Sequence, residues 1–204
     1  MIDLEKAKKR FERHKATLTD YGNIKILDFK VPDSNEYRIR FLFEEDYCRL
    51  HISGDLGELT ATNYNNMVYE KFRDYVNNVG YFEEKINCHN RPIYVYDEEA
   101  ARDYLKVFFE KYDLVEEILY DKSPFDTDEE CIDEFIDDIL EDFSQERGLG
   151  SFGYDRLSKL YEDAFEFSDE IGKQETGILD LYMLAFKLAK EQLQKEEENG
   201  EINN

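Results

Sequence analysis

Two cysteines and two histidines have the side-chain types that bind zinc in proteins. Cys48 and His51 are separated by two residues, and Cys88 and His89 are adjacent. Residues 48 and 51 differ by an odd number on a predicted strand, so their side chains point to opposite faces. Two adjacent residues are also awkward ligands for one metal ion. We therefore expect no zinc site, and a zinc-binding protein is the least favoured alternative.

A second candidate metal site is a calcium loop that would begin with Asp126-x-Asp128-x-Glu130. The sixth position of such a loop should be glycine and is Cys131, and the twelfth should be glutamate and is Asp137. The helical spacing of apolar residues also continues through this segment. We therefore expect no bound metal and no cofactor.

The sequence contains no catalytic motif that we recognise. His14, His51 and His89 have no serine or cysteine nucleophile motif near them, and there is no phosphate-binding loop or dinucleotide fingerprint. Carboxylates are abundant, but general acid–base catalysis needs a carboxyl group whose pKa is shifted by an apolar pocket. These carboxylates lie on predicted exposed faces. We expect a protein that is not an enzyme.

The distribution of charge is the most informative feature of the sequence. There are 49 Asp and Glu residues against 26 Lys and Arg, a net charge of −23. Residues 1–96 hold 16 acidic and 15 basic residues, whereas residues 97–204 hold 33 and 11. A chain this acidic does not bind nucleic acid or an anionic membrane through a general basic surface. The expected partner is therefore a basic protein.

Two acidic clusters are the candidate partner-binding residues. The first holds 11 acidic residues in 21 positions and no Lys or Arg, and the second follows it closely. The first comprises Asp126, Asp128, Glu129, Glu130, Asp133, Glu134, Asp137, Asp138, Glu141, Asp142 and Glu146, and the second comprises Glu162, Asp163, Glu166, Asp169 and Glu170.

The first cluster favours mimicry of DNA. Like-charged neighbours on one helix repel by tenths of a kcal/mol each, which suggests that the electric field has a use. If all 21 residues were helical, they would span ~31 Å with about one charge per 3 Å, against one per ~1.7 Å in duplex DNA. Such an array could occupy a basic groove built for nucleic acid. The alternative is a solvated face that serves only solubility.

The elements that would position these residues form an α+β fold. We expect a helix over 3–17, strands over 24–31, 36–43, 47–53 and 58–62 in an antiparallel meander, a helix over 67–79 and a short strand over 92–96. From residue 97 onward everything reads as helical, with helices over 126–146, 154–167 and 178–193. Thr127 and Glu130 have the spacing of a capping box. The expected domains are 1–96, near-neutral, and 97–204, acidic and helical.

The compartment follows from cysteine usage and hydropathy. Cys48, Cys88 and Cys131 are odd in number and widely spaced, which fits free thiols in a reducing environment. The charged N-terminus does not read as a signal peptide, and no apolar run approaches the ~18 residues of a membrane span. We expect a cytoplasmic protein with no membrane contact, and the oligomeric state is left open.

Two short segments carry a resemblance to a known class of proteins. Leu50-His-Ile-Ser-Gly-Asp-Leu-Gly57 and Gly80-Tyr-Phe-Glu-Glu-Lys85 resemble small accessory proteins of phages and prophages of Gram-positive bacteria. The resemblance covers about residues 24–97 and carries no functional residues across. An acidic protein of this kind is similar to anti-CRISPR proteins, several of which occupy the DNA channel of a Cas nuclease. The resemblance implies a protein that acts in the cytoplasm of an infected bacterium.

The first hypothesis is a phage-encoded, non-catalytic inhibitor of a host defence nuclease, with a Cas effector as the expected partner. The second is an interaction module that binds through the N-terminal sheet and exposed aromatics such as Tyr64, Tyr69 and Tyr81. In that case the acidic half would be only a soluble scaffold.

Overall fold

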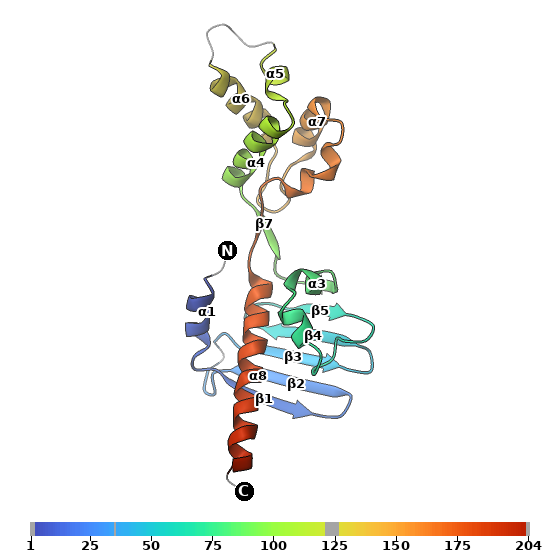
Figure 1. Cartoon of the computed structure of the whole chain (residues 1–204), viewed down its shortest axis with the longest axis vertical. Helices are drawn as coiled ribbons and strands as arrows, with labels where there is room; N and C mark the ends of the chain where they lie inside the picture. Colours follow the sequence, from blue (N-terminus) through green and yellow to red (C-terminus); the bar gives the residue numbers. More distant parts are fainter. Residues whose placement is uncertain (1–2, 35, 121–126, 203–204) are drawn as a thin grey trace. The chain divides into compact units, whose positions relative to one another are not determined.

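The computed structural model describes residues 3–34, 36–120 and 127–202. The chain divides into two compact units. Unit 1 is made of Met1–Ile93 and Thr176–Asn204, and unit 2 is made of Tyr94–Glu175. Unit 2 is therefore inserted, in sequence, between the last strand and the last helix of unit 1 (Figure 1).

Unit 1 is built on a six-stranded antiparallel meander. Each strand pairs with the next one along the chain, so the order in the sheet equals the order in the sequence. The strands are β1 (Lys15–Asp20), β2 (Ile24–Lys30), β3 (Ile39–Glu44), β4 (Arg49–Gly54), β5 (Leu59–Thr62) and β6 (Ile86–His89). The predicted meander is confirmed, and β6 is a strand that the sequence pattern did not indicate.

Alternation along the strands decides which face of the sheet is buried. Ile39, Phe41 and Phe43 are buried on β3, whereas Arg40 between them is exposed. The buried face is covered by α8 (Ile178–Ile202), which packs against β1, β2 and β3. The Phe186 ring of α8 lies 4.8 Å from the Phe72 ring and 5.5 Å from the Phe41 ring, measured between centroids.

Three shorter helices complete unit 1, namely α1 (Leu4–Phe11), α2 (Arg73–Val76) and α3 (Val79–Glu83). The predicted helix over 3–17 was wrong in its second half. Residues from Lys15 onward form β1, because Ala16 and Leu18 pair with Phe29 and Leu27 of β2 and join the core of the sheet. The predicted helix over 67–79 is helical only at α2 and at Val79, where α3 begins. β1 is one edge strand of the sheet, and β6 is the other.

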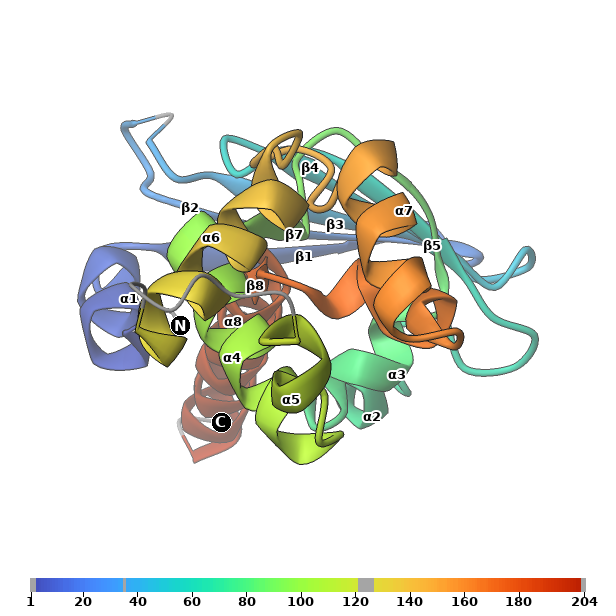
Figure 2. The same ribbon diagram turned by 90° about the horizontal axis from the view of Figure 1, so that it is seen from above.

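Unit 2 is mainly helical in the part that the structure describes. Its core combines Leu105 and Phe109 of α4 with Ile136 and Ile139 of α6 and Leu157 of α7. Figures 1 and 2 both show α6 beside α4. The elements are β7 (Tyr94–Tyr96), α4 (Glu98–Lys111), α5 (Val115–Ile118), α6 (Asp128–Leu140), α7 (Ser151–Leu160), the 3₁₀ turns η1 (Ala164–Glu166) and η2 (Ser168–Glu170), and β8 (Lys173–Glu175).

The predicted division at residue 97 differs from the observed one. β7 pairs with β8 in a separate two-stranded ribbon, so the chain enters and leaves unit 2 through neighbouring strands. The last helix then belongs to unit 1 and not to the acidic unit. The physical reason is that the apolar face of the meander needs a cover, and α8 supplies Tyr182, Phe186 and Ala189 to that core.

The predicted α+β class is confirmed. Within the described residues, no helix combines the length and the apolar character that crossing a membrane requires.

Candidate acidic interface

The negative charge belongs to unit 2. Residues 94–175 contain 27 acidic and 8 basic residues, a net charge of −19. The two segments of unit 1 together contain 22 acidic and 18 basic residues, a net charge of −4. The inserted unit therefore carries most of the field that a partner would meet.

Helix α6 is shorter than the acidic run that contains it. The helix ends at Leu140, after 13 residues, and Ser144 and Gly148 then form an isolated bridge. The prediction of one continuous helix over 126–146 was therefore wrong in its last part, and residue 126 lies outside the described residues. After Leu140 the chain turns, and Gly148, which closes the bridge with Ser144, adopts a φ of 72° that favours glycine. The predicted start is confirmed: Thr127 and Glu130 form a complete capping box. Thr127 lowers the pKa of the Glu130 carboxyl group through hydrogen bonds from its backbone and side chain.

Three carboxylates of α6 are paired with cations of other helices. Asp133 lies 2.7 Å from Lys106 of α4, and Asp138 lies 2.7 Å from Arg156 of α7. Asp137 pairs with Arg102 of α4, which raises the pKa of that guanidinium. The expectation that this helix lacks compensating cations was incomplete, because packing supplies them across helices rather than along one. Each such exposed pair is worth at most about 1 kcal/mol.

Asp142 has a structural role in unit 2. Its Oδ2 accepts a hydrogen bond from the Phe152 backbone N–H at 2.9 Å, and its Oδ1 accepts one from Gly153 at 3.1 Å. Both donors lie in the first turn of α7, where backbone N–H groups have no partner within the helix. The residue before α7 is Gly150, which has no side chain to cap it. The Asp142 carboxylate therefore caps α7 from a distance in sequence.

The second cluster lies beyond α7. The predicted helix over 154–167 ends at Leu160, and the acidic residues follow on the two 3₁₀ turns. Of these residues, Glu170 pairs with Lys173 at 2.8 Å.

Eight predicted partner-binding carboxylates remain available. They are exposed, and within the described part of the chain their side chains make no hydrogen bond or ion pair. We call these residues the free acidic set: Glu129, Glu134, Glu141, Glu146, Glu162, Asp163, Glu166 and Asp169. Asp128 begins α6, where a carboxylate is favourable to the helix dipole. Asp126 lies outside the described residues.

The cysteines and histidines do not converge. Cys48 lies in the β3–β4 turn and its thiol donates to the Glu45 carbonyl, and His89 bonds to the Arg91 carbonyl. His51 contacts Glu44 at 3.1 Å and Thr60 at 3.2 Å, in a cross-strand polar row. Among residues 3–34, 36–120 and 127–202, no group of three or more metal-binding side chains gathers.

The predicted aromatic contacts of the sheet need a correction. Tyr64 is 94% exposed, as the second hypothesis requires, but Tyr69 is buried and packs on Phe43. Tyr81 stacks on Tyr75, with ring centroids 5.6 Å apart. Burial raises the pKa of Tyr69 to about 12. Sequence alone could not separate these tyrosines, because the segment after β5 has no regular period.

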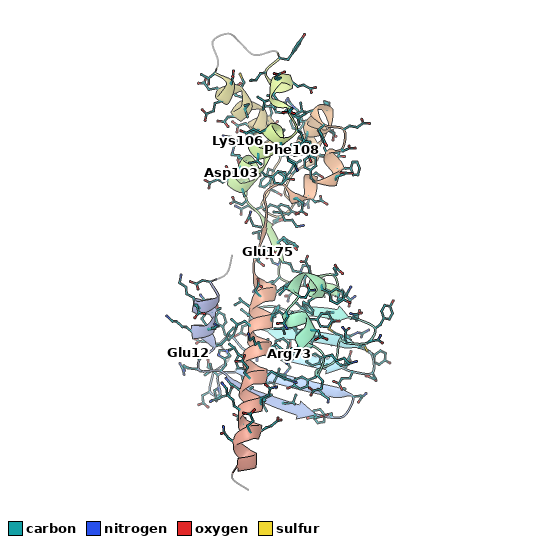
Figure 3. The ribbon with its side chains drawn as sticks, viewed as in Figure 1. Glu12, Arg73, Asp103, Lys106, Phe108 and Glu175 are labelled. Atoms are coloured by element: carbon teal, nitrogen blue, oxygen red, sulfur yellow. The ribbon has the colours of Figure 1, made fainter. Side chains whose placement is uncertain are left out.

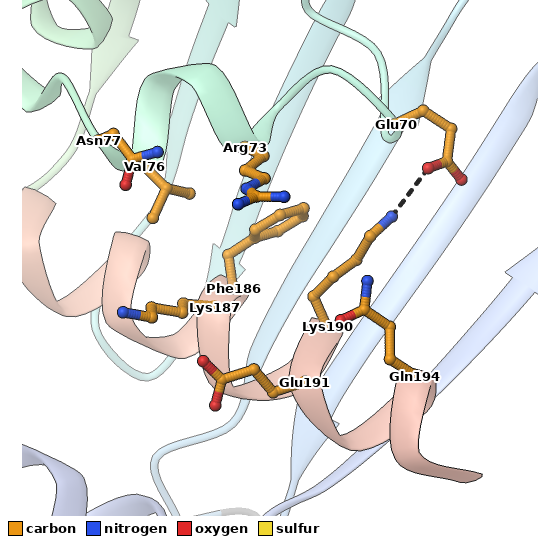
Figure 4. Close-up of a pocket in the computed structure, with 9 residues that line it drawn as sticks. All are labelled: Glu70, Arg73, Val76, Asn77, Phe186, Lys187, Lys190, Glu191 and Gln194. Carbon is orange, nitrogen blue, oxygen red and sulfur yellow. Dashed lines mark hydrogen bonds and ion pairs between the residues drawn. The ribbon is translucent and has the colours of Figure 1, made fainter. Parts of the chain in front are cut away.

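Unit 1 has a pocket of about 380 Å³ between the α2 segment and α8 (Figure 4). Its lining includes Arg73, Lys187 and Lys190, over a floor that includes Phe186. Lys190 is paired with Glu70 at 3.0 Å, and Glu191 adds a second carboxylate. The mixed charges largely offset one another, so the pocket does not favour an anionic ligand.

Unit 2 has an apolar groove that the sequence analysis missed. Tyr104, Phe108 and Tyr112 of the α4 segment face Phe167, which follows η1. A signal was present in the sequence, because apolar residues on α4 cover more of the helix surface than one buried stripe needs.

Comparisons of this chain with protein-family models, curated proteins and solved structures find no match.

Proposed function

We propose that this chain is a non-catalytic inhibitor that binds a basic, nucleic-acid-binding protein through the free acidic set of unit 2. The observation that carries the proposal is the concentration of eight exposed carboxylates, which pair with no described residue, in a unit of net charge −19. The resemblance of residues 24–97 to phage accessory proteins supports the finer form of the proposal. In that form the partner is a Cas nuclease of the infected host.

Binding would draw on charge complementarity and the release of counterions from the partner's groove. Lys and Arg residues that hold DNA phosphates would instead meet carboxylates. Asp133, Asp137 and Asp138 would contribute less to binding, because each is already paired with a cation within unit 2. The affinity should therefore depend on the free acidic set and fall steeply as salt rises.

The test is inhibition of target-DNA cleavage by a purified Cas nuclease loaded with its guide, at low and moderate salt. The test variant neutralises four members of the free acidic set: E129Q, E134Q, E141Q and E146Q. The matched control makes the same change of charge at exposed positions of unit 1: E12Q, D33N, E36Q and D74N.

We expect the native chain and the control to inhibit cleavage and to compete with DNA, and the test variant to do neither. Circular dichroism should show that both variants keep the native fold, because none of the substituted side chains makes an ion pair or hydrogen bond to a described residue. Equal inhibition by the test variant and the native chain would refute binding through these carboxylates. If the native chain inhibited none of a panel of Cas nucleases of different types, the finer form would be refuted.

One observation favours a second candidate function, which is protein binding through unit 1. Tyr21, Tyr47 and Tyr64 are 67%, 70% and 94% exposed. The register of β1–β5 places the β1–β2 turn, the β3–β4 turn and the end of β5, which Tyr64 follows, at the same end of the sheet. Exposed tyrosines suit protein recognition, because they offer large contact areas at low entropic cost. If the substitutions Y21S, Y47S and Y64S abolished inhibition while the acidic variant kept it, the interface would lie here.

A further inference from the structure

The groove of unit 2 runs along α4 and has a volume of about 590 Å³. Its floor is aromatic: the Phe108 ring lies 4.1 Å from the Phe167 ring and 4.6 Å from the Tyr112 ring, measured between centroids. Val107 lines the same groove and is 64% exposed. The exposed Val107 lines the groove together with the partly exposed rings of Tyr104, Tyr112 and Phe167.

Carboxylates border this groove on both sides. Asp103 lies one turn before Val107 on α4, and Glu166 lies on the η1 wall. Figure 3 labels Asp103 and Phe108 on the same helix. Burial raises the pKa of Tyr104, the Glu170 carboxylate adds to this shift, and Lys111 opposes it.

The groove already holds a cation against one of its rings. Lys111 Nζ lies 4.9 Å from the centroid of the Tyr112 ring, and Lys111 is the one cation among the described lining residues. The Tyr112 ring at this end therefore already makes a cation–π contact. An arginine guanidinium suits such a place better than an ammonium, because it stacks on rings and pairs with a carboxylate at the same time.

We propose that this groove binds a basic amphipathic segment of the partner protein, with apolar side chains over Val107 and Phe108 and an arginine between Tyr104 and the Asp103 or Glu166 carboxylate. The inference rests on the proposed function for the identity of the partner, and it adds the chemistry of the segment. The α4 wall from Ala100 to Lys111 spans ~16 Å, which matches about three turns of a partner helix. A second copy of this chain is disfavoured, because it would bring the same negative charge to the groove.

The probe is a synthetic helical peptide of about four turns with leucines on one face and arginines beside them. A scrambled peptide of the same composition has the same charge and no apolar face. Fluorescence anisotropy measures the binding of each peptide to the full chain, at low and moderate salt. The test variants are V107S and V107R, and the matched control is Y120S, which removes an apolar side chain that is 92% exposed and does not line the groove.

We expect the amphipathic peptide to bind more tightly than the scrambled one. V107S should weaken the amphipathic peptide roughly fivefold to tenfold, because one buried valine side chain is lost from the contact. V107R should weaken it further, since it adds bulk and like charge, and Y120S should leave it unchanged. Replacing the arginines of the peptide by lysines should also weaken binding, through loss of ring stacking.

The groove inference and the proposed function fail in different ways. If both peptides bind equally and V107R changes neither, the acidic surface acts by charge alone, and the groove inference is overturned while the proposed function stands. If the amphipathic peptide binds through Val107 but the chain inhibits no nuclease, the groove is upheld and the proposed function is not. If neither peptide binds, the groove inference is overturned, and the cleavage assay decides the proposed function.

Discussion

Substitution of Asp142 should destabilise unit 2, although this exposed residue belongs to the predicted partner-binding cluster. Its two hydrogen bonds to the first turn of α7 measure 2.9 and 3.1 Å. Loss of a capping acceptor at a helix N-terminus costs about 0.5–2 kcal/mol, and loss of a negative charge there costs about 0.3–1 kcal/mol more. We therefore expect D142A to lower the free energy of unfolding by about 2 kcal/mol, and D142N by roughly half as much, because it keeps one acceptor oxygen.

The matched control is the neighbouring Glu141. It is exposed at the end of α6, and its side chain makes no hydrogen bond or ion pair to a described residue, so E141A should change stability by less than about 0.5 kcal/mol. For a unit of about 80 residues, 2 kcal/mol corresponds to a fall in Tm of roughly 8–16 °C. Thermal unfolding followed by circular dichroism measures this shift. Amide hydrogen exchange should show lost protection at Phe152 and Gly153.

Equal Tm values for D142A and E141A would refute the capping role. Unchanged exchange at the two amides of α7 would refute it independently. The result also decides how the acidic surface should be tested, since a variant that includes Asp142 would lose binding through unfolding and not through lost charge.

Three further predictions concern the cores and the helix packing. Phe186→Ala should lower the free energy of unfolding of unit 1 by about 3–5 kcal/mol, because the Phe186 ring is almost fully buried. A urea titration measures this loss, and a loss below about 1 kcal/mol would contradict the prediction. Burial raises the pKa of Tyr69 and of Tyr182 from 10.0 to about 12. The free energy of unfolding of unit 1 should therefore be unaffected by these groups below pH 10.0 and should fall as the pH rises towards 12. Unfolding measured at a series of pH values should show a shallower fall for Y182F than for the native chain. Gly153→Ala should lower the Tm, because a Cβ there would overlap the Ile139 carbonyl oxygen where α7 meets α6, and an unchanged Tm would contradict that close approach.

The strands of unit 1 could be read from the sequence because their side chains alternate. Ile39, Phe41 and Phe43 are apolar and buried, and the intervening Arg40 is exposed, so the period of two alone indicates a half-buried strand. The apolar stripe of α6 was predictable in the same way, since Ile136 and Ile139 fall at helical spacing and are buried. Both patterns involve only residues that are close together in the chain, so they can be recognised in the sequence.

The place of the last helix could not be read in this way. Its apolar residues indicate that α8 is buried but not what buries it. Nothing in Ile178–Ile202 distinguishes packing on the acidic helices from packing on a sheet more than a hundred residues earlier. The choice depends on which apolar face lacks a cover, and that is a property of the whole fold.

The acidic surface shows the same division between what is local and what is not. The concentration of charge in one part of the chain, and the capping box at the start of α6, could both be predicted from residue types and spacing. Which carboxylates are free depends on how the helices pack against one another. Arg102 and Lys106 neutralise Asp137 and Asp133 because α4 packs beside α6, and Asp142 reaches α7 because the chain turns after Leu140. Ion pairs and caps between distant segments depend on how helices pack, and no residue spacing along one helix encodes that packing.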